Sequence, residues 1–417
     1  MQKILAAILL AISMAGAASA EPQGIMLGAL ALHPSYSITG TYDDNIYLVP
    51  PNKDGHAVAG GGKRGSWILT NKLGLGLSLP VGDANKFTAG YEARSDVYRA
   101  QPSGNNAISQ KANGAYNFKG SIIKARLFDD YLNTQDPQFN PNNTAVMGEL
   151  VARERRWQNT AGGMVEYGLG DKFFLAGDGQ HTVHKYLSRT MGDKLNRFES
   201  LFGVKTGYKV APKTRVYVGM HRQIVHYSVT HGDSAQQHVA NHKDWLVDGG
   251  VEGDFTAKLK GQLQAGGAYR QHDKDNAYAQ EHRITRNWTV KANLNYKPTS
   301  NDVVNLSANR GLNDAVSGGN FYVTTGGSLD VAHTFKKLTL GLNGGMQTDK
   351  YSETITLGGL TAMRRDDTYS AGAKVDYKIQ EWLLAGVAYK HMRRFSVFSQ
   401  QYNYKDSQTS TTLSVAF

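Results

Sequence analysis

The sequence predicts an all-β fold, a transmembrane antiparallel up-and-down β-barrel of about 18 strands with short periplasmic turns and long extracellular loops. Three observations predict it. Apolar and polar residues alternate with period two along most of the chain. Short and long polar connectors alternate between these segments, and the chain ends on an alternating segment that closes with the aromatic residue Phe417.

The first 20 residues have the features of a secretory signal peptide. Lys3 precedes an apolar run, Ile4–Ala11, and the small residues Ala18 and Ala20 stand before Glu21. We therefore expect residues 1–20 to be a signal peptide, residues 21–33 a periplasmic N-terminal segment and residues 34–417 the barrel. The expected location is the outer membrane of a Gram-negative bacterium.

The composition narrows the possible classes. The 417 residues include 46 glycines and no cysteine, which excludes disulfide frameworks and thiolate metal sites. Beyond the signal peptide the longest apolar runs, Gly24–Leu32 and Trp382–Tyr389, are too short to span a bilayer as helices. A closed barrel is the other structure that satisfies its backbone in lipid. The net charge of +11 is spread along the strands, so we expect no nucleic-acid partner.

Each predicted strand has one apolar and one polar face. In Trp67–Leu79, tryptophan and leucine side chains share one face, while Thr70, Lys72, Gly74, Gly76 and Ser78 share the other. The same alternation predicts strands over Phe198–Val210, Ile284–Tyr296, Leu338–Met346 and Tyr369–Ile379.

The connectors give the strand count. Long polar connectors, among them Ser352–Arg364, lie between tight turns, and eight such turns joining nine strand pairs give about 18 strands. The tight turns are Gly82–Asn85, Lys119–Gly120, Gly170–Lys172, Ala211–Thr214, Ala257–Leu259, Pro298–Asn301, Lys336–Lys337 and Gln380–Glu381.

The end of the chain and its aromatic residues favour the outer membrane. Leu413, Val415 and Phe417 resemble the closing-strand signal that the barrel assembly machinery recognises, so we expect this machinery, outer-membrane lipid and lipopolysaccharide as partners. Tryptophan and tyrosine residues fall near the predicted strand ends, as expected for aromatic belts at the two membrane surfaces.

The faces opposite the apolar ones are predicted to line the lumen. Eleven cations and four anions fall on these faces, which indicates a basic lumen that favours anionic solutes. Basic residues that line a general pore or bind lipid phosphates are the alternative interpretation. The pore-lining candidates are Lys72, Arg94, Lys124, Arg126, Arg156, Lys205, Lys209, Lys291, Lys374 and Lys378, with Lys390 as an eleventh cation.

No catalytic or metal-binding pattern stands out. His181 and His184 are three residues apart, which places them on opposite faces of a strand. The histidines of the segment 221–242 are interpreted as solvated residues of a strand and its loop. The sequence therefore predicts no enzyme, metal or cofactor.

One short motif carries a family resemblance. The residues Tyr42, Asp43, Asp44, Asn45, Ile46 and Tyr47 form an aromatic–Asp–Asp–Asn–Ile–aromatic pattern at the end of the first predicted strand. This segment resembles the opening strand of the outer-membrane β-barrel porin family associated with exopolysaccharide export loci. The resemblance implies a channel that contributes to exopolysaccharide export, with an anionic polysaccharide and export-complex proteins as partners.

Two other functions remain open at this stage. The same residues are compatible with a general or nutrient-specific diffusion porin. A structural or adhesive surface barrel is the third reading, with its lumen blocked by loops or by the apolar segment Gly24–Leu32.

Overall fold

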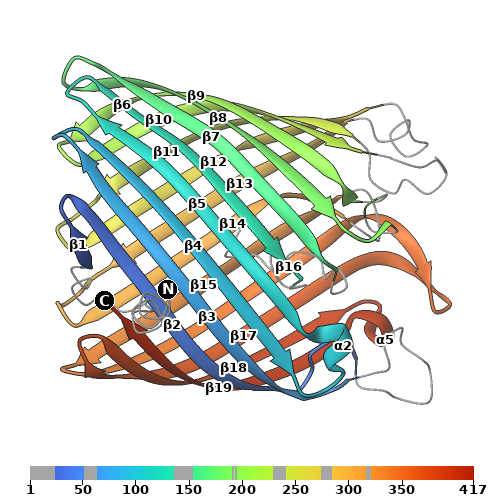
Figure 1. Cartoon of the computed structure of the whole chain (residues 1–417). Coiled ribbons are helices and arrows are strands. Elements are labelled where there is room, and N and C mark those ends of the chain that lie inside the picture. Colours follow the sequence, from blue (N-terminus) through green and yellow to red (C-terminus); the bar gives the residue numbers. More distant parts are fainter. Residues whose placement is uncertain are drawn as a thin grey trace.

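The structure is a computed structural model that describes residues 24–50, 63–135, 154–189, 192, 195–228, 241–273, 284–315 and 321–417. Its strands form one 19-stranded antiparallel sheet (Figure 1). Strands β2 to β19 follow each other around the sheet, and β19 pairs with β2 to close it. The predicted 18-strand barrel is thereby confirmed, with β1 as one extra strand. The expected signal peptide lies outside the described residues.

The strands of the barrel are 12 to 21 residues long. They are β2 (Leu30–Asp43), β3 (Ser66–Val81), β4 (Asn85–Tyr98), β5 (Ala107–Lys119), β6 (Ile123–Thr134), β7 (Arg156–Leu169), β8 (Phe173–Tyr186), β9 (Arg197–Ala211), β10 (Thr214–Tyr227), β11 (His242–Asp254), β12 (Leu259–His272), β13 (Ile284–Tyr296), β14 (Asp302–Asp314), β15 (Phe321–Phe335), β16 (Leu338–Leu357), β17 (Leu360–Gln380), β18 (Leu383–Ser396) and β19 (Tyr404–Ala416).

Two one-turn helices, α2 (Pro102–Asn105) and α5 (Ser399–Tyr402), lie at the long-loop end of the barrel (Figure 1). In the described part of the chain, no helix combines the length and apolar character needed to cross a bilayer.

The prediction of a long connector over Ser352–Arg364 was wrong. These residues instead extend β16 and β17 into a hairpin that projects beyond the wall (Figure 1). Gly358 and Gly359, with φ of 60° and 80°, make the two-residue turn. Left-handed glycines match the twist of a two-residue hairpin, and the threonine and isoleucine residues before them favour the extended conformation.

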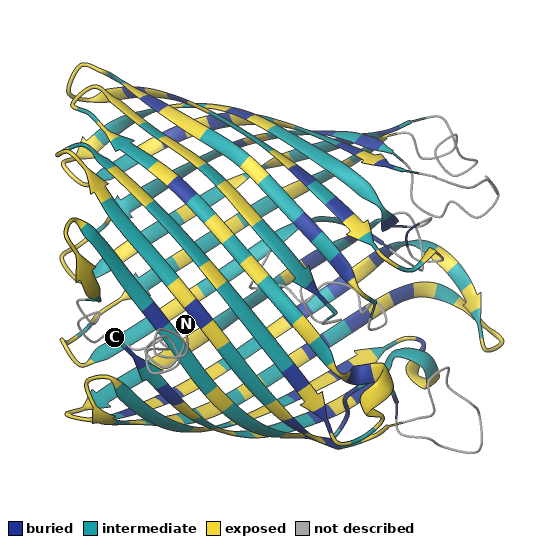
Figure 2. Cartoon of the chain, viewed as in Figure 1, coloured by how far each residue is buried: buried dark blue, intermediate teal, exposed yellow. Residues whose placement is uncertain are grey.

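Burial alternates along each strand, and buried residues gather toward the end with the long loops (Figure 2). The aliphatic face points away from the barrel axis. Aromatic pairs mark the two rims of this face. Tyr42–Trp67 lies near the long loops, with ring centroids 5.3 Å apart, whereas Phe173–Tyr208 lies near the tight turns, at 5.0 Å. This arrangement is that of a membrane-spanning barrel with aromatic belts.

The seam that closes the barrel includes both described ends of the chain. Strand β2 begins at Leu30, within the segment that we expected to precede the barrel. β1 (Ile25–Leu27) pairs with Leu30–Leu32 of β2, on the stretch beyond the last β19 pair, Ala416 with Ser35. Phe417 stacks on Trp382, with ring centroids 5.9 Å apart. The apolar N-terminal segment is thus part of the sheet.

Candidate functional site

The lumen wall near the tight turns carries a ladder of alternating charges. Lys124 Nζ lies 2.8 Å from Glu166, whose other carboxylate oxygen lies 2.5 Å from Arg215. Arg215 also lies 2.5 Å from Glu252, which accepts a hydrogen bond from Lys205 at 2.8 Å. This charge ladder holds three cations and two anions from five strands, β6, β7, β9, β10 and β11.

Aromatic rings hold the charge ladder in place. The guanidinium carbon of Arg215 lies 4.5 Å from the ring centre of Phe174, which is fully buried. The ammonium group of Lys205 lies 3.8 Å from the ring centre of Tyr217. Because a cation over an aromatic face is attracted by the ring quadrupole, these contacts fix both cations against the wall.

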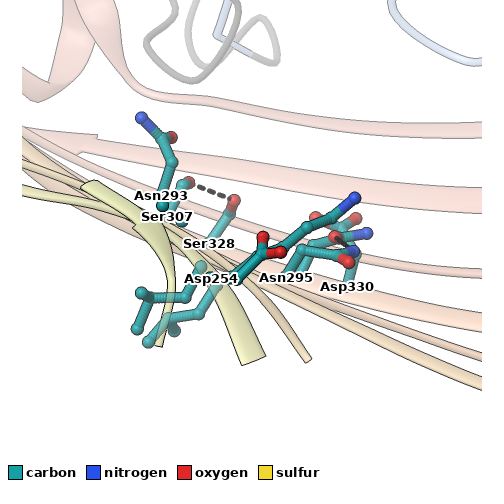
Figure 3. Close-up of a pocket in the computed structure, with 12 residues that line it drawn as sticks. Asp254, Asn293, Asn295, Ser307, Ser328 and Asp330 are labelled. Atoms are coloured by element: carbon teal, nitrogen blue, oxygen red, sulfur yellow. Dashed lines mark hydrogen bonds between the residues drawn. The ribbon is translucent and has the colours of Figure 1, made fainter. Parts of the chain in front are cut away.

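The inner face of β12 to β15 carries a dense set of amide and hydroxyl groups, here called the amide track. A cavity of about 630 Å³ runs over it (Figure 3). Asn295 donates to Asn305 at 2.6 Å, and the hydroxyls of Ser307 and Ser328 lie 2.8 Å apart. The track consists of Gln262, Gln264, Asn293, Asn295, Asn305, Ser307, Asn309 and Ser328. A second cavity of about 330 Å³ shares Asn293 and Ser307 with the first, so the two are neighbours.

The end of β14 stays paired with β15 but separates from β13, and its last side chain reaches residues of strands up to four positions away. Asp314, the last residue of β14, accepts a hydrogen bond from Tyr227 of β10 at 2.7 Å. Arg270 of β12 lies 2.7 Å from Asp314, and His242 of β11 lies 3.0 Å from it. Asp244 completes the cluster at 2.7 Å from Arg270. We call these five residues the staple.

The staple is almost entirely shielded from water. The side chains of His242 and Arg270 are 1% and 4% exposed. A second buried group continues it, since Arg197 stacks on Tyr227 and lies 2.8 Å from Glu199, which in turn lies 3.0 Å from His184. Buried charges are stable only when each has an opposite charge or a hydrogen-bond partner. The cluster therefore holds the end of β14 firmly inside the lumen.

The family-motif residues form a knot at the closing seam. The side-chain amide of Asn45 donates to the carbonyls of Val49 and Lys405, at 2.9 and 3.0 Å. The backbone amide of Asn45 donates to Asp43, and that of Ser407 donates to Asp44, both at 2.8 Å. Asn45 is fully buried, so the knot joins the end of β2 to β19.

Asp43 and Asp44 also approach Asp406. One carboxylate oxygen of each lies within 4.8 Å of the others, a spacing that an oxygen-liganded cation could bridge.

Replacing Asn45 with alanine should weaken the seam. The substitution leaves the carbonyls of Val49 and Lys405 and the backbone amide of Val49 without their side-chain partner, so we expect the free energy of unfolding to fall by about 2–4 kcal/mol. Urea unfolding, followed by the heat-modifiable mobility of the folded barrel on gels, measures this loss. Asn113→Ala, on the lumen face of β5, is the control and should change stability by less than about 1 kcal/mol. Equal effects of the two variants would contradict the structural role of the motif.

The ten predicted pore-lining residues all occupy described strands, and register and alternation place them on the face opposite the aliphatic one. Six of them have acidic partners, which sequence alternation alone did not reveal: Lys72, Arg94, Lys124, Lys205, Lys374 and Lys378. Lys209 donates to the carbonyl of Asp171, and Arg126 stacks on Phe128. Arg156 is buried. Lys291 lines the smaller cavity and has no ion pair within the described ranges.

The staple and Arg215 were missed by the sequence analysis. The interpretation of His242 as a solvated histidine was wrong. His242 is the first residue of β11 and is only 1% exposed. His231 and His238 lie outside the described residues. Arg215 shares a face with Tyr217 and opposes Val216 and Val218, so the alternation of the segment after the predicted turn Ala211–Thr214 is the signal that could have found it. No local signal marks Asp314, because its contacts depend on the path of β14.

Comparison with known proteins identifies the family of this barrel. Residues 180–417, more than half of the chain, match the family described as Putative beta-barrel porin 2. The chain belongs to this family. The porin has the barrel, the aromatic belts and the polar lumen of an outer-membrane channel, which places it in the outer membrane of a Gram-negative bacterium. A search of curated proteins gives no match.

Several solved porin structures resemble the chain. A BenF-like porin from Pseudomonas fluorescens Pf-5 has a TM-score of 0.48 at 9% identity, over 94% of this chain and 100% of that one. OccK2 from Pseudomonas aeruginosa has a TM-score of 0.47 at 8% identity, over 93% of this chain and 98% of that one. OccAB3 from Acinetobacter baumannii has a TM-score of 0.47 at 10% identity, over 93% of this chain and 99% of that one. Similarities this distant carry no information about the solute.

Proposed function

We propose that this porin is a passive channel that contributes to exopolysaccharide export, and that it catalyses no reaction. The observation that carries the proposal is the amide track along β12 to β15, with its cavity of about 630 Å³. A barrel of 18 strands is too wide for side chains to fill, so the track borders a passage.

The amide track suits a polymer of sugars. Sugar hydroxyls both donate and accept hydrogen bonds, and so do asparagine, glutamine and serine side chains. Each net hydrogen bond contributes only about 0.5–1.5 kcal/mol, so a chain of sugars can move from one group to the next without being trapped.

Charge adds a preference to this passage. Lys291 stands on the inner face of β13 beside the amide track, and in the described part of the chain it has no acidic partner. The charge ladder contributes one further net positive charge, from three cations and two anions. Both features support an anionic polymer as the solute. Lipopolysaccharide, the barrel assembly machinery and export-complex proteins remain the proposed partners.

Block of single channels by oligosaccharides tests the proposal. We expect anionic and neutral oligosaccharides to interrupt the current in planar bilayers. Asn293→Leu combined with Asn305→Leu should shorten each block about tenfold, because the two substitutions remove hydrogen bonds worth about 1–3 kcal/mol together. Asn113→Leu, on the lumen face of β5, is the matched control and should leave the block unchanged.

Two outcomes would overturn the proposal. Block that is insensitive to the track variants, together with equal passage of unrelated small solutes, would identify a general diffusion porin. A folded barrel with no conductance would identify a structural barrel with a blocked lumen.

A further inference from the structure

The wall of the barrel is interrupted between β13 and β14. These strands pair only over Val290–Tyr296 and Val304–Arg310. Beyond that point, Ile284–Thr289 pairs only with β12, and Gly311–Asp314 pairs only with β15. The staple accounts for the separation, because it draws the end of β14 toward the barrel interior. We call the interval between the two strand ends the split.

A cavity of about 330 Å³ lies beside the split. Its lining includes Gln223, Asp244 and Gln264 from the inner face of β10 to β12. It also includes Val290, Arg310 and Leu312, which alternate onto the outer face of β13 and β14. The cavity therefore borders both strands that separate at the split. Gly311, between Arg310 and Leu312, also lines this cavity, and a Cβ atom there would meet nothing within 4 Å.

The rim of the split holds polar atoms that lack partners. Arg310 donates to Asn287 at 3.1 Å, yet Arg310 Nε and Asn287 Nδ2 are buried and make no hydrogen bond within the described ranges. Buried donors without acceptors are costly, and a carboxylate or phosphate oxygen is the acceptor that a guanidinium group binds most strongly. The rim therefore has the donors of an anion site.

The split opens at the height of the aromatic belt. The guanidinium of Arg310 lies 4.3 Å from the ring centre of Trp288. Trp245 and Tyr269, which are register partners, continue the belt across β11 and β12, and Tyr269 pairs with Arg286. Tryptophan and tyrosine at this height mark the interface between acyl chains and head groups. An anion held at Arg310 can thus keep an attached chain in the bilayer.

We propose that the split is a lateral portal that binds an amphiphile with an acyl chain and an anionic carboxylate or phosphate head. The head binds at Arg310 and Asn287, with Lys291 on the lumen side. The chain extends past Val290 and Leu312 into the outer leaflet. The portal depends on the wall and the staple alone, so it stands whether or not a polysaccharide passes through the lumen.

Cysteine crosslinking tests whether the wall is open. The chain has no native cysteine. Asn293→Cys with Ser307→Cys joins register partners below the split and should form a disulfide rapidly. Asn287→Cys with Asn313→Cys would face each other if the same register continued, and should remain at least tenfold slower to oxidise. Equal rates for the two pairs would show a closed wall and overturn the portal.

Fluorescence quenching tests the ligand. A fluorophore is attached to Asn309→Cys beside the cavity, or to Ser410→Cys on the lumen face of β19 as the control. In phosphatidylcholine vesicles, nitroxide-labelled stearate or nitroxide-labelled phosphatidic acid should quench the first label at least threefold more than the second. Quenching by stearate alone identifies a free long-chain acid, and quenching by phosphatidic acid alone identifies a lipid head group; either supports the portal.

A filling variant completes the test. Gly311→Trp should abolish the selective quenching, while Gly114→Trp, another position with open space, should preserve it. The heat-modifiable mobility of both variants reports folding. If neither probe quenches the label at position 309 selectively, the portal is wrong. If nitroxide-labelled phosphatidylcholine quenches that label as strongly as the anionic probes, the anion site is wrong.

Discussion

Arg270→Met should destabilise the barrel by about 3–5 kcal/mol, because it removes the arginine that pairs with both carboxylates of the staple. Arg270 lies 2.7 Å from both Asp244 and Asp314, and its side chain is 4% exposed. The end of β14 should then leave the inner face of β10 to β12. We expect a lower urea midpoint in the unfolding transition and a larger single-channel conductance.

Two controls separate the staple from a general loss of charge. Arg365→Met breaks the Arg365–Asp367 pair, whose arginine side chain is 53% exposed, and should cost no more than about 1 kcal/mol. Adding Asp244→Asn and Asp314→Asn to Arg270→Met removes the uncompensated charges and should restore most of the stability. A loss no larger than that of Arg365→Met would show that the staple does not hold β14.

Neutralising both acids of the charge ladder should strengthen anion selectivity. Glu166→Gln with Glu252→Gln changes the ladder from three cations and two anions to three cations, so its charge rises from +1 to +3. A unit charge about 4 Å away is worth about 1 kcal/mol in water, so the permeability ratio of chloride to potassium should rise about fivefold or more. The reversal potential in a potassium chloride gradient measures this ratio.

Salt and position provide the controls for this experiment. The reversal potential should be measured near 0.1 M salt, because the Debye length is then about 10 Å and the charge ladder can act on passing ions. Glu381→Gln removes an acid that is 84% exposed at a tight turn, and should leave the ratio unchanged. An unaltered reversal potential in the double variant would show that ions do not pass along this wall.

Much of the architecture could be predicted because it depends on the alternation of apolar and polar residues that are close in sequence. The apolar face of Trp67–Leu79 and the eight tight turns are properties of neighbouring residues, and they determine the number and direction of the strands. The β16–β17 hairpin was missed because a polar stretch outside the membrane has the composition of a loop. Its Gly358–Gly359 turn is the local signal that could have identified it.

The lumen was harder to predict than the wall. Alternation shows which face Lys124 and Lys205 occupy, but their partners Glu166 and Glu252 come from other strands. Asp314 illustrates the limit most clearly, since its contacts with Tyr227 and Arg270 depend on β14 leaving its neighbour. Such pairings are set by register and by the path of the whole strand, which no window of local sequence contains.

The hairpin of β16 and β17 projects from the barrel at the end with the long loops, which faces the outside of the cell. Arg364 anchors its base, lying 2.7 Å from Asp366 and 3.5 Å from the ring centre of Tyr402 in α5. A peptide epitope inserted between Gly358 and Gly359 would therefore be displayed away from the cell without disturbing the membrane-embedded wall.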